Sequence, residues 1–198
     1  MKKFTCCISL ITVFILGMAV PATFAGNSDG SGYSPEMQVK IEEMKQELKK
    51  FTDEKASVEK NLKTFDELDF VVFSNQEWTR FHESHASDIK VYWPDGHSTT
   101  GLEKHIEDLK AMFVYAPDTN IKVHPVKIGS DDYTSVIGVM SGTFSKPMPI
   151  GDGKFIQPTG KKFSITMCTV GHWKDGVMIE EWLFWDNATY MKQIGIGN

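Results

Sequence analysis

The chain has 198 residues, of which 41% are hydrophobic and 24% are charged, and its formal net charge is −5. This length and composition are ordinary for one folded domain with a sizeable core, and they exclude a low-complexity or repeat protein. The negative charge, with no basic run that has interleaved aromatic residues, argues against nucleic acid as a partner.

The first 25 residues have the pattern of a secretory signal peptide. Lys2 and Lys3 form its positive end, and an apolar segment follows from Ile8 to Val20. Small residues at Thr23 and Ala25 permit cleavage after Ala25. The apolar segment is short for a membrane span, although an uncleaved anchor is the alternative interpretation. We therefore expect a secreted or periplasmic protein with no membrane contact after cleavage.

Residues 26–34 are rich in glycine and serine and are interpreted as a flexible linker. Ser34 followed by Pro35 is a typical helix start. A long amphipathic helix is predicted over residues 35–65, because its apolar residues follow one another at alternating steps of three and four. They are Met37, Ile41, Met44, Leu48, Phe51, Val58, Leu62 and Phe65, with Lys55 as an interruption. Two interpretations stay open, a coiled-coil-like seam and a helix packed against its own domain.

The rest of the chain, residues 66–198, combines helical and strand patterns. We expect helices over 70–81 and 102–115, strands over 88–93, 121–128, 133–144, 163–173 and 177–186, and a short closing helix. Asp175-Gly176 predicts a two-residue hairpin turn. Residues 145–160 predict a loop, because they are rich in proline and glycine. Helices that precede strands predict an α+β fold with an antiparallel sheet curled around the helices.

The last predicted strand carries a carboxylate among apolar side chains. By alternation Glu181 shares a face with Ile179, Leu183 and Trp185. If that face is concave, burial would raise the pKa of Glu181 toward a value useful for acid-base chemistry. An edge-strand glutamate that reaches solvent is the alternative. Both faces of the strand are largely apolar, which predicts a homodimer or a covering helix.

Aromatic residues near isolated polar groups suggest a pocket for a small apolar molecule, although core filling is the alternative use of the aromatic residues. The aromatic residues are Trp78, Trp93, Trp182, Phe184 and Trp185, and the polar groups are His85, His97, Glu181 and Asp186. The expected pocket residues are Trp78, Trp93, Met167, Thr169, Leu183, Trp185 and Asp186. The familiar nucleotide, hydrolase and metal signatures are absent from the sequence. His82 and His85 are three residues apart but lack a third ligand nearby in the sequence, so no metal is expected.

Four segments resemble the SnoaL-like polyketide cyclase family, in particular proteins labelled ester cyclases. They are SDIKVYWPDGHSTTG, APDTNIKVHPVKIGSDDYTSVIGVMSGTF, PTGKKFSITM and VGHWKDGVMIEEWLFWDN with MKQIG. The resemblance covers about residues 66–197. It implies a cone-shaped domain of the nuclear-transport-factor-like superfamily, with a curved antiparallel sheet wrapped by helices. It also implies a pocket at the open end, to which Met167 belongs, and commonly a homodimer.

The resemblance also implies where a catalytic pair would lie. In polyketide cyclases a histidine on the first hairpin strand faces an aspartate on the second, and the two handle the proton in an aldol ring closure. Aligned on the Asp-Gly turn, these positions fall on Thr169 and Leu183, which should face each other. Neither can act as a general base near neutral pH. Glu181, His85 and His97 are therefore the candidates for acid-base catalysis.

Two functions remain open. One is an exported, cofactor-free enzyme that transfers protons on a small, largely apolar carbonyl compound. The other is a non-catalytic small-molecule-binding or dimeric interaction module on the same fold, which the replacement of the cyclase pair favours.

Overall fold

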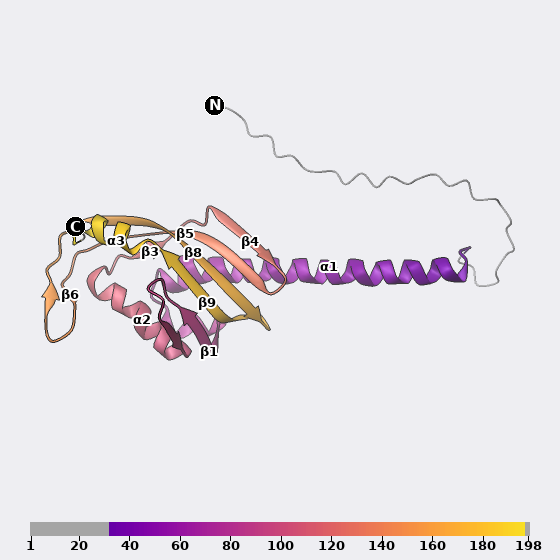
Figure 1. Cartoon of the computed structure of the whole chain (residues 1–198), viewed down its shortest axis with the longest axis horizontal. Helices are drawn as coiled ribbons and strands as arrows, with labels where there is room; N and C mark the ends of the chain where they lie inside the picture. The colour runs from indigo at the N-terminus through magenta and orange to yellow at the C-terminus, as the bar shows by residue number, and fades with distance from the viewer. Residues whose placement is uncertain (1–31, 197–198) are drawn as a thin grey trace, which may run out of the picture. The chain divides into compact units, whose positions relative to one another are not determined.

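The computed structural model describes residues 32–196, so the predicted signal peptide and most of the predicted linker lie outside the described residues. Among the described residues, 32–44 and 45–196 belong to two separate units. Figure 1 labels the helices and strands along the chain. The second unit holds the sheet and all of the shorter helices. Between residues 32 and 196, no helix combines the length and the apolar character needed to cross a membrane.

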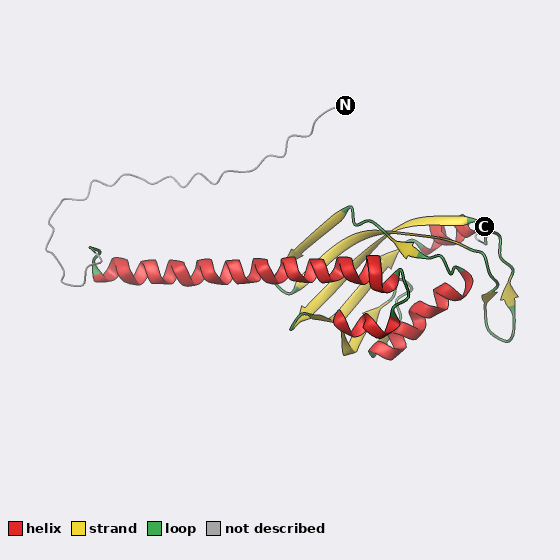
Figure 2. Cartoon of the chain, turned by 180° about the vertical axis from the view of Figure 1, so that it is seen from behind, coloured by secondary structure: helices red, strands yellow, loops and turns green. Residues whose placement is uncertain are grey.

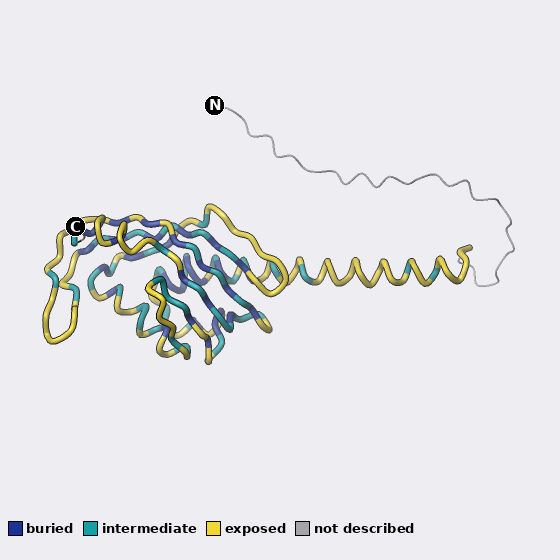
Figure 3. Tube along the Cα trace, in the orientation of Figure 1, coloured by how far each residue is buried: buried dark blue, intermediate teal, exposed yellow. Residues whose placement is uncertain are grey.

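The long helix α1 runs from Pro35 to Glu67, close to its predicted bounds. The Ser34 hydroxyl accepts a hydrogen bond from the Met37 amide at 3.3 Å, which caps the helix start as expected. Phe65 near its C-terminus is buried in the core of the second unit, whereas Leu48 and Phe51 are exposed. Figure 3 colours the chain by burial and shows the buried segments gathered in the sheet and the helices beside it. The last turns of α1 therefore pack against their own domain, and the apolar positions before them stay open to solvent.

The expectation of one helix over residues 70–81 was wrong. A π-helix, η1, covers Leu68–Phe73, and a 3-10 helix, η2, covers Trp78–Glu83. Between them Gln76 has a φ of 59°, a left-handed conformation that no continuous helix contains. The Ser74 hydroxyl accepts from the Ile121 amide at 2.9 Å and so ties this break to the sheet.

One sheet of seven strands organises the second unit. Its strands are β1 (His85–Tyr92), β2 (Ser98–Thr100), β3 (Asn120–Ile121), β4 (Val126–Ser130), β5 (Tyr133–Thr143), β8 (Lys162–Lys174) and β9 (Val177–Trp185). Their order is β2-β1-β9-β8-β5-β3, with β4 also paired to β5. The expected purely antiparallel sheet needs a correction, because β1 pairs with β9 in parallel. The single strand expected over 121–128 is two short strands separated at Pro125, which has no amide proton to donate to a sheet.

The hairpin of β8 and β9 forms around the predicted turn. Asp175 and Gly176 have φ values of 53° and 86°, the positive pair that a type I′ turn requires. Thr169 pairs with Leu183, as the alignment of the turn predicted. The hairpin therefore has the predicted register at its centre.

A β-bulge in the hairpin changes which side chains share a face with Glu181. Trp173 pairs with Met178 whereas His172 pairs with Glu180, so Ile179 is an extra residue in β9. Met178, not Ile179 as expected, therefore lies on the buried face with Glu181, and Met178 has no exposed surface.

Helices α2 (Leu102–Tyr115) and α3 (Asn187–Ile194) complete the unit. The bounds of α2 match the prediction. The Asp186 carboxylate accepts hydrogen bonds from the amides of Ala188 and Thr189 at 2.9 and 3.2 Å, and so caps α3. The predicted loop over 145–160 contains a small ribbon of β6 (Met148–Pro149) and β7 (Phe155–Ile156).

Within the second unit the sheet curves, and η1, η2 and α2 lie along its concave side (Figure 2). Fully buried Phe81, Ile89 and Met178 belong to the core between these layers. The second unit is therefore a mixed α+β domain, and its core lies between the sheet and these helices.

Candidate active site

A cavity of about 80 Å³ lies between the concave side of the sheet and η1, η2 and α2. Most of its lining is apolar, and the ionisable residues in it are Asp69, His85, His105, Asp108 and Glu181. A wider groove of about 530 Å³ runs beside the end of α1 and is lined mainly by exposed and half-exposed side chains. This cavity is the candidate site, because three of its ionisable groups, His85, His105 and Glu181, are buried and close together.

Most of the residues expected to form a pocket line this cavity. They are His85, Trp93, Met167, Thr169, Glu181, Leu183 and Trp185. The structure therefore brings together side chains from β1, β8, β9 and the loop after β1.

Three of the expected residues do not line the cavity. Trp78 packs into the core against Phe81 and Phe113, with ring centroids 5.5 and 5.3 Å away. His97 lies in the turn between β1 and β2, half exposed, and hydrogen-bonds to Asp95. Asp186 is exposed, because its carboxylate caps α3. These corrections remove Trp78, His97 and Asp186 from the site.

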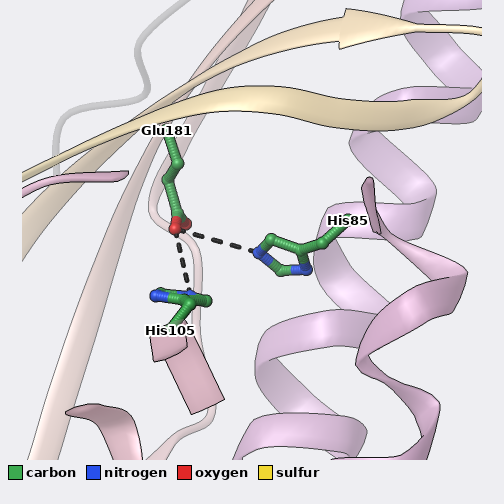
Figure 4. A group of neighbouring side chains, drawn as sticks. All are labelled: His85, His105 and Glu181. Atoms are coloured by element: carbon green, nitrogen blue, oxygen red, sulfur yellow. Dashed lines mark ion pairs between the residues drawn. The ribbon is translucent and has the colours of Figure 1, made fainter. Parts of the chain in front are cut away.

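Glu181 stands at the centre of a cluster of buried side chains (Figure 4). Its Oε2 atom lies 3.3 Å from Nε2 of His105 and 3.8 Å from Nε2 of His85. The three side chains are at most 5% exposed, and they come from β9, α2 and the start of β1. One donor or acceptor atom from each lies within 4.8 Å of the others, so the three residues could also hold a metal ion.

Local structure explains how the two histidines reach Glu181. His85 begins β1 two residues after the end of η2, and its Nδ1 atom lies 3.2 Å from the carbonyl oxygen of Phe81 and 2.9 Å from the hydroxyl of Ser84. His105 shares one face of α2 with Leu109 and Met112, at helical spacings of four and seven, and all three line the cavity. The sheet and α2 thus place the two imidazoles next to each other, with ring centroids 5.2 Å apart, at one oxygen of the Glu181 carboxylate.

The sequence-based expectation that the pKa of Glu181 is raised was wrong in direction. Burial acts to raise the pKa of Glu181, but interaction with the His85 side chain and with the nearby His105 outweighs burial and leaves the pKa below its ordinary value. Burial lowers the pKa of His105 to about 4, despite the nearby Glu181 carboxylate. A charged carboxylate therefore faces a neutral His105 imidazole at neutral pH.

Sequence reasoning missed His105, Asp69 and Asp108. The available signal was the helical spacing of His105, Asp108, Leu109 and Met112, which puts two ionisable groups on the apolar face of α2. Asp69 gave no comparable signal, because a π-helix does not follow the periodicity of an α-helix.

The cavity presents one carboxylate among mostly apolar side chains. The Oε2 atom of Glu181 is buried and makes no hydrogen bond within residues 32–196. A ligand that carries a proton or a hydrogen-bond donor would satisfy that atom, so the arrangement suits proton transfer in a site with little water.

A family model described as SnoaL-like polyketide cyclase matches residues 68–194. Among solved structures, the chain is similar to a protein from Jannaschia sp. CCS1 whose assignment as a SnoaL-like polyketide cyclase is provisional. The two are 19% identical, the TM-score is 0.60, and the match covers 70% of this chain and 94% of that one. It is also similar to IdmH from Streptomyces antibioticus, provisionally assigned as a polyketide cyclase, at 22% identity and a TM-score of 0.58 over 68% of this chain and 98% of that one.

A protein from Catenulispora acidiphila DSM 44928 with a ketosteroid isomerase-like fold also matches. It is 12% identical with a TM-score of 0.52, and the match covers 63% of this chain and 87% of that one. Identities this low show a shared fold. No curated protein matches the chain significantly.

Proposed function

This chain belongs to the SnoaL-like polyketide cyclase family, and we propose that it is an exported enzyme that transfers protons on a small, largely apolar carbonyl compound. The observation that carries the proposal is the Glu181 carboxylate, buried in an apolar cavity between His105 and His85 with an oxygen that lacks a hydrogen bond.

In the proposed reaction Glu181 takes a proton from the carbon next to the carbonyl group. The electron pair of the broken C–H bond forms an enolate, which can then attack a second carbonyl group of the same compound. The proton returns to the oxygen of the new C–O⁻ group, so the carboxylate is regenerated. His105, which lies 3.3 Å from Glu181, is placed to hydrogen-bond to the reacting compound or to the carboxylate.

The cavity limits the size of the substrate. Its volume of about 80 Å³ is well below the ~300–1,000 Å³ of pockets that enclose drug-sized ligands. The proposal is therefore for a small carbonyl compound, or for a larger one that inserts only its reactive end.

Replacement of Glu181 by Gln tests this function. The substrate is first sought among small molecules that co-purify with the protein and in a panel of small 1,3-dicarbonyl compounds, followed by deuterium exchange at the acidic carbon. Glu181→Gln should slow exchange about 10²–10⁴-fold while binding survives. Glu180→Gln is the matched control, because Glu180 is the next residue of β9 and hydrogen-bonds to His172 away from the cavity. Equal exchange rates for the wild type and Glu181→Gln would reject the proposal.

A non-catalytic binding protein is the second candidate function. The observation that favours it is the direct pairing of Thr169 with Leu183 at the positions of the family's catalytic pair. Under this alternative Glu181→Gln leaves ligand affinity nearly unchanged, and neither variant nor wild type exchanges the ligand's protons.

Export is proposed from the sequence of the first 25 residues. Lys2, Lys3, the apolar segment and the small residues before position 26 support removal of a signal peptide and a secreted or periplasmic location. N-terminal sequencing of exported protein should start near Gly26, and recovery of Met1 from exported material would contradict it.

A second copy of the chain is the proposed macromolecular partner. Met37, Ile41, Met44, Leu48 and Phe51 recur at steps of four and three along α1, the spacing of a helix-pairing seam. Four of them are exposed large hydrophobic residues, and Phe184 on β9 is also 51% exposed. These exposed apolar side chains support homodimer formation.

A further inference from the structure

The cluster of His85, His105 and Glu181 has a geometry that hydrogen bonding among its members does not explain. Oε2 of Glu181 lies 3.3 and 3.8 Å from the two Nε2 atoms, beyond the ~2.7–3.2 Å of ordinary N–H···O bonds. Nε2 of His85 and Oε2 of Glu181 are both fully buried and make no hydrogen bond in the described chain. Buried polar atoms without partners are costly, so such a group of them points to a missing occupant.

The orientation of His85 indicates the charge of that occupant. Its Nδ1 atom lies 3.2 Å from the Phe81 carbonyl oxygen, which can only accept, and 2.9 Å from the Ser84 hydroxyl, which donates to the same carbonyl and can accept from Nδ1. This network favours a proton on Nδ1. In the neutral imidazole the lone pair is then on Nε2, and Figure 4 shows this nitrogen pointing at the Glu181 carboxylate. Two acceptors that point at each other from 3.8 Å leave room for a cation between them. Fixing of Nδ1 by a backbone carbonyl is also how proteins orient metal-binding histidines.

The distances match those between the ligands of a transition-metal ion. Ligand atoms about 2.0–2.2 Å from an ion, at the angles of tetrahedral or octahedral coordination, are roughly 3.0–3.5 Å apart. The 3.3 and 3.8 Å between Glu181 and the two histidines are within a few tenths of an ångström of these values, and the three ligand atoms all lie within 4.8 Å of one another, so closure around an ion needs a movement of the side chains. Two imidazole nitrogens and one carboxylate oxygen form a donor set for zinc or iron(II), whereas magnesium and calcium prefer oxygen alone.

The neighbouring cavity leaves one side of the cluster open. The buried Oδ2 atom of Asp108, one helical turn after His105, lines the same cavity and also lacks a partner. Three protein ligands with an open position are typical of catalytic rather than structural metal sites.

We propose that His85, His105 and Glu181 bind one divalent transition-metal ion, of the zinc or iron(II) class, at the edge of the cavity. This differs from the sequence-based expectation of no metal, which rested on His82 and His85. The inference goes beyond the proposed function, because ion binding is measurable without a substrate. With an ion bound, Oε2 of Glu181 would be a ligand and only its other oxygen would remain to take a proton, while the open position would be where a carbonyl oxygen or water binds.

The test uses the chain from Gly26 without a histidine tag, freed of metals by a chelator and then titrated. Zinc is followed by calorimetry and cobalt(II) by its visible absorption. We expect one ion per chain. Glu181→Gln and His105→Asn each remove a ligand and should weaken binding more than ~100-fold, beyond the usual effect of losing an outer hydrogen-bonding partner. The matched controls Glu180→Gln and His97→Asn lie outside the cavity and should bind like the wild type.

A further variant, in which one proposed metal-binding side chain is replaced by another, keeps the test decisive if Glu181→Gln or His105→Asn fails to fold. His105→Cys retains a zinc ligand and should add a sulfur-to-cobalt charge-transfer band to the cobalt(II) spectrum, which only direct coordination produces. The proposal is overturned if the wild type binds less than one ion per chain at millimolar zinc. It is also overturned if Glu181→Gln and His105→Asn bind as tightly as the wild type, or if a crystal structure with zinc shows a water among the three residues. Deuterium exchange by chelator-treated protein would support the proposed function whatever the outcome for metal.

Discussion

The imidazole of His124 lies against the Asp69 carboxylate, with Nε2 2.8 Å from Oδ2, and this contact joins the segment before β4 to the π-helix η1 at the cavity wall. The other ring nitrogen of His124 lies 2.8 Å from Asp66, which also hydrogen-bonds to Lys127. The His124 side chain is 1% exposed. Two carboxylates on opposite sides of one buried ring favour the doubly protonated imidazolium.

This arrangement predicts a stability that declines with rising pH. Burial acts to lower the pKa of His124, but the hydrogen bonds to Asp69 and Asp66 outweigh it and raise the pKa above its ordinary value. The folded state thus holds a proton that the unfolded state loses near pH ~6.5. The stabilisation is complete below that pH and is lost as the pH rises through the raised pKa. Urea unfolding of the wild type should show this decline.

His124→Asn should unfold at lower urea than the wild type at pH ~6 and show a smaller decline toward pH ~9, because its side chain does not titrate. His97→Asn is the control, since His97 is exposed and should leave the pH dependence unchanged. Equal pH dependence of unfolding in the wild type and in His124→Asn would contradict the assignment of a charged His124; the comparison cancels the contribution of His105, whose lowered pKa acts in the opposite direction in both proteins.

Asp186 is predicted to matter for stability and not for ligand binding. Its carboxylate accepts hydrogen bonds from two amides at the start of α3 and from the Thr189 hydroxyl. Asp186→Ala should lower the free energy of unfolding by about 0.5–2 kcal/mol, and Asp186→Asn by less, because Asn also caps helices. Thermal unfolding and ligand titration measure the two effects. A loss of ligand affinity without a loss of stability would instead indicate that Asp186 contacts the ligand.

Gly142 is predicted to be sterically required in β5. A Cβ atom there would lie 2.8 Å from the ring of Phe163 and 3.1 Å from the Cα atom of Thr119, and the second of these is backbone. Gly142→Ala should therefore destabilise the fold by about 1–3 kcal/mol. Gly138→Ala on the same strand is the matched control, because its nearest contacts are 3.4 Å away. Equal melting temperatures for the two variants would mean that Phe163 moves aside easily.

The sequence predicted the elements that depend on local pattern. Alternation with period two and the Asp175-Gly176 turn gave the β8–β9 hairpin with Thr169 opposite Leu183, and helical periodicity gave the bounds of α2. The family resemblance predicted the curved sheet and the helices around it. These succeeded because turn chemistry and burial of one face act over a few residues.

The candidate site was less predictable, because it depends on single-residue irregularities and on distant segments. The extra Ile179 in β9 moved Met178 onto the face of Glu181, which strict alternation could not foresee. His105 and Glu181 are far apart in the sequence, and only the packing of α2 onto the sheet brings them to 3.3 Å. The direction of the pKa shift of Glu181 followed from these neighbours, which were unknown when only its own strand was considered.

The exposed positions of α1 give the last prediction, which concerns self-association. Leu48 is 66% exposed and Phe51 65% exposed, although both fall on the seam with step sizes of three and four. Burial of a leucine side chain is worth about 1.5–3 kcal/mol, and a symmetric dimer buries each position twice. Leu48→Glu places a charge in that seam, so it should shift the chain from dimer to monomer in light scattering at tens of micromolar.

Gln46→Glu adds the same charge two residues away, off the seam, and should leave the dimer intact. A dimer that survives Leu48→Glu but dissociates with Phe184→Glu would instead locate the interface on the outer face of β9, where Phe184 is half exposed. A wild-type monomer at these concentrations would exclude both surfaces as dimer interfaces.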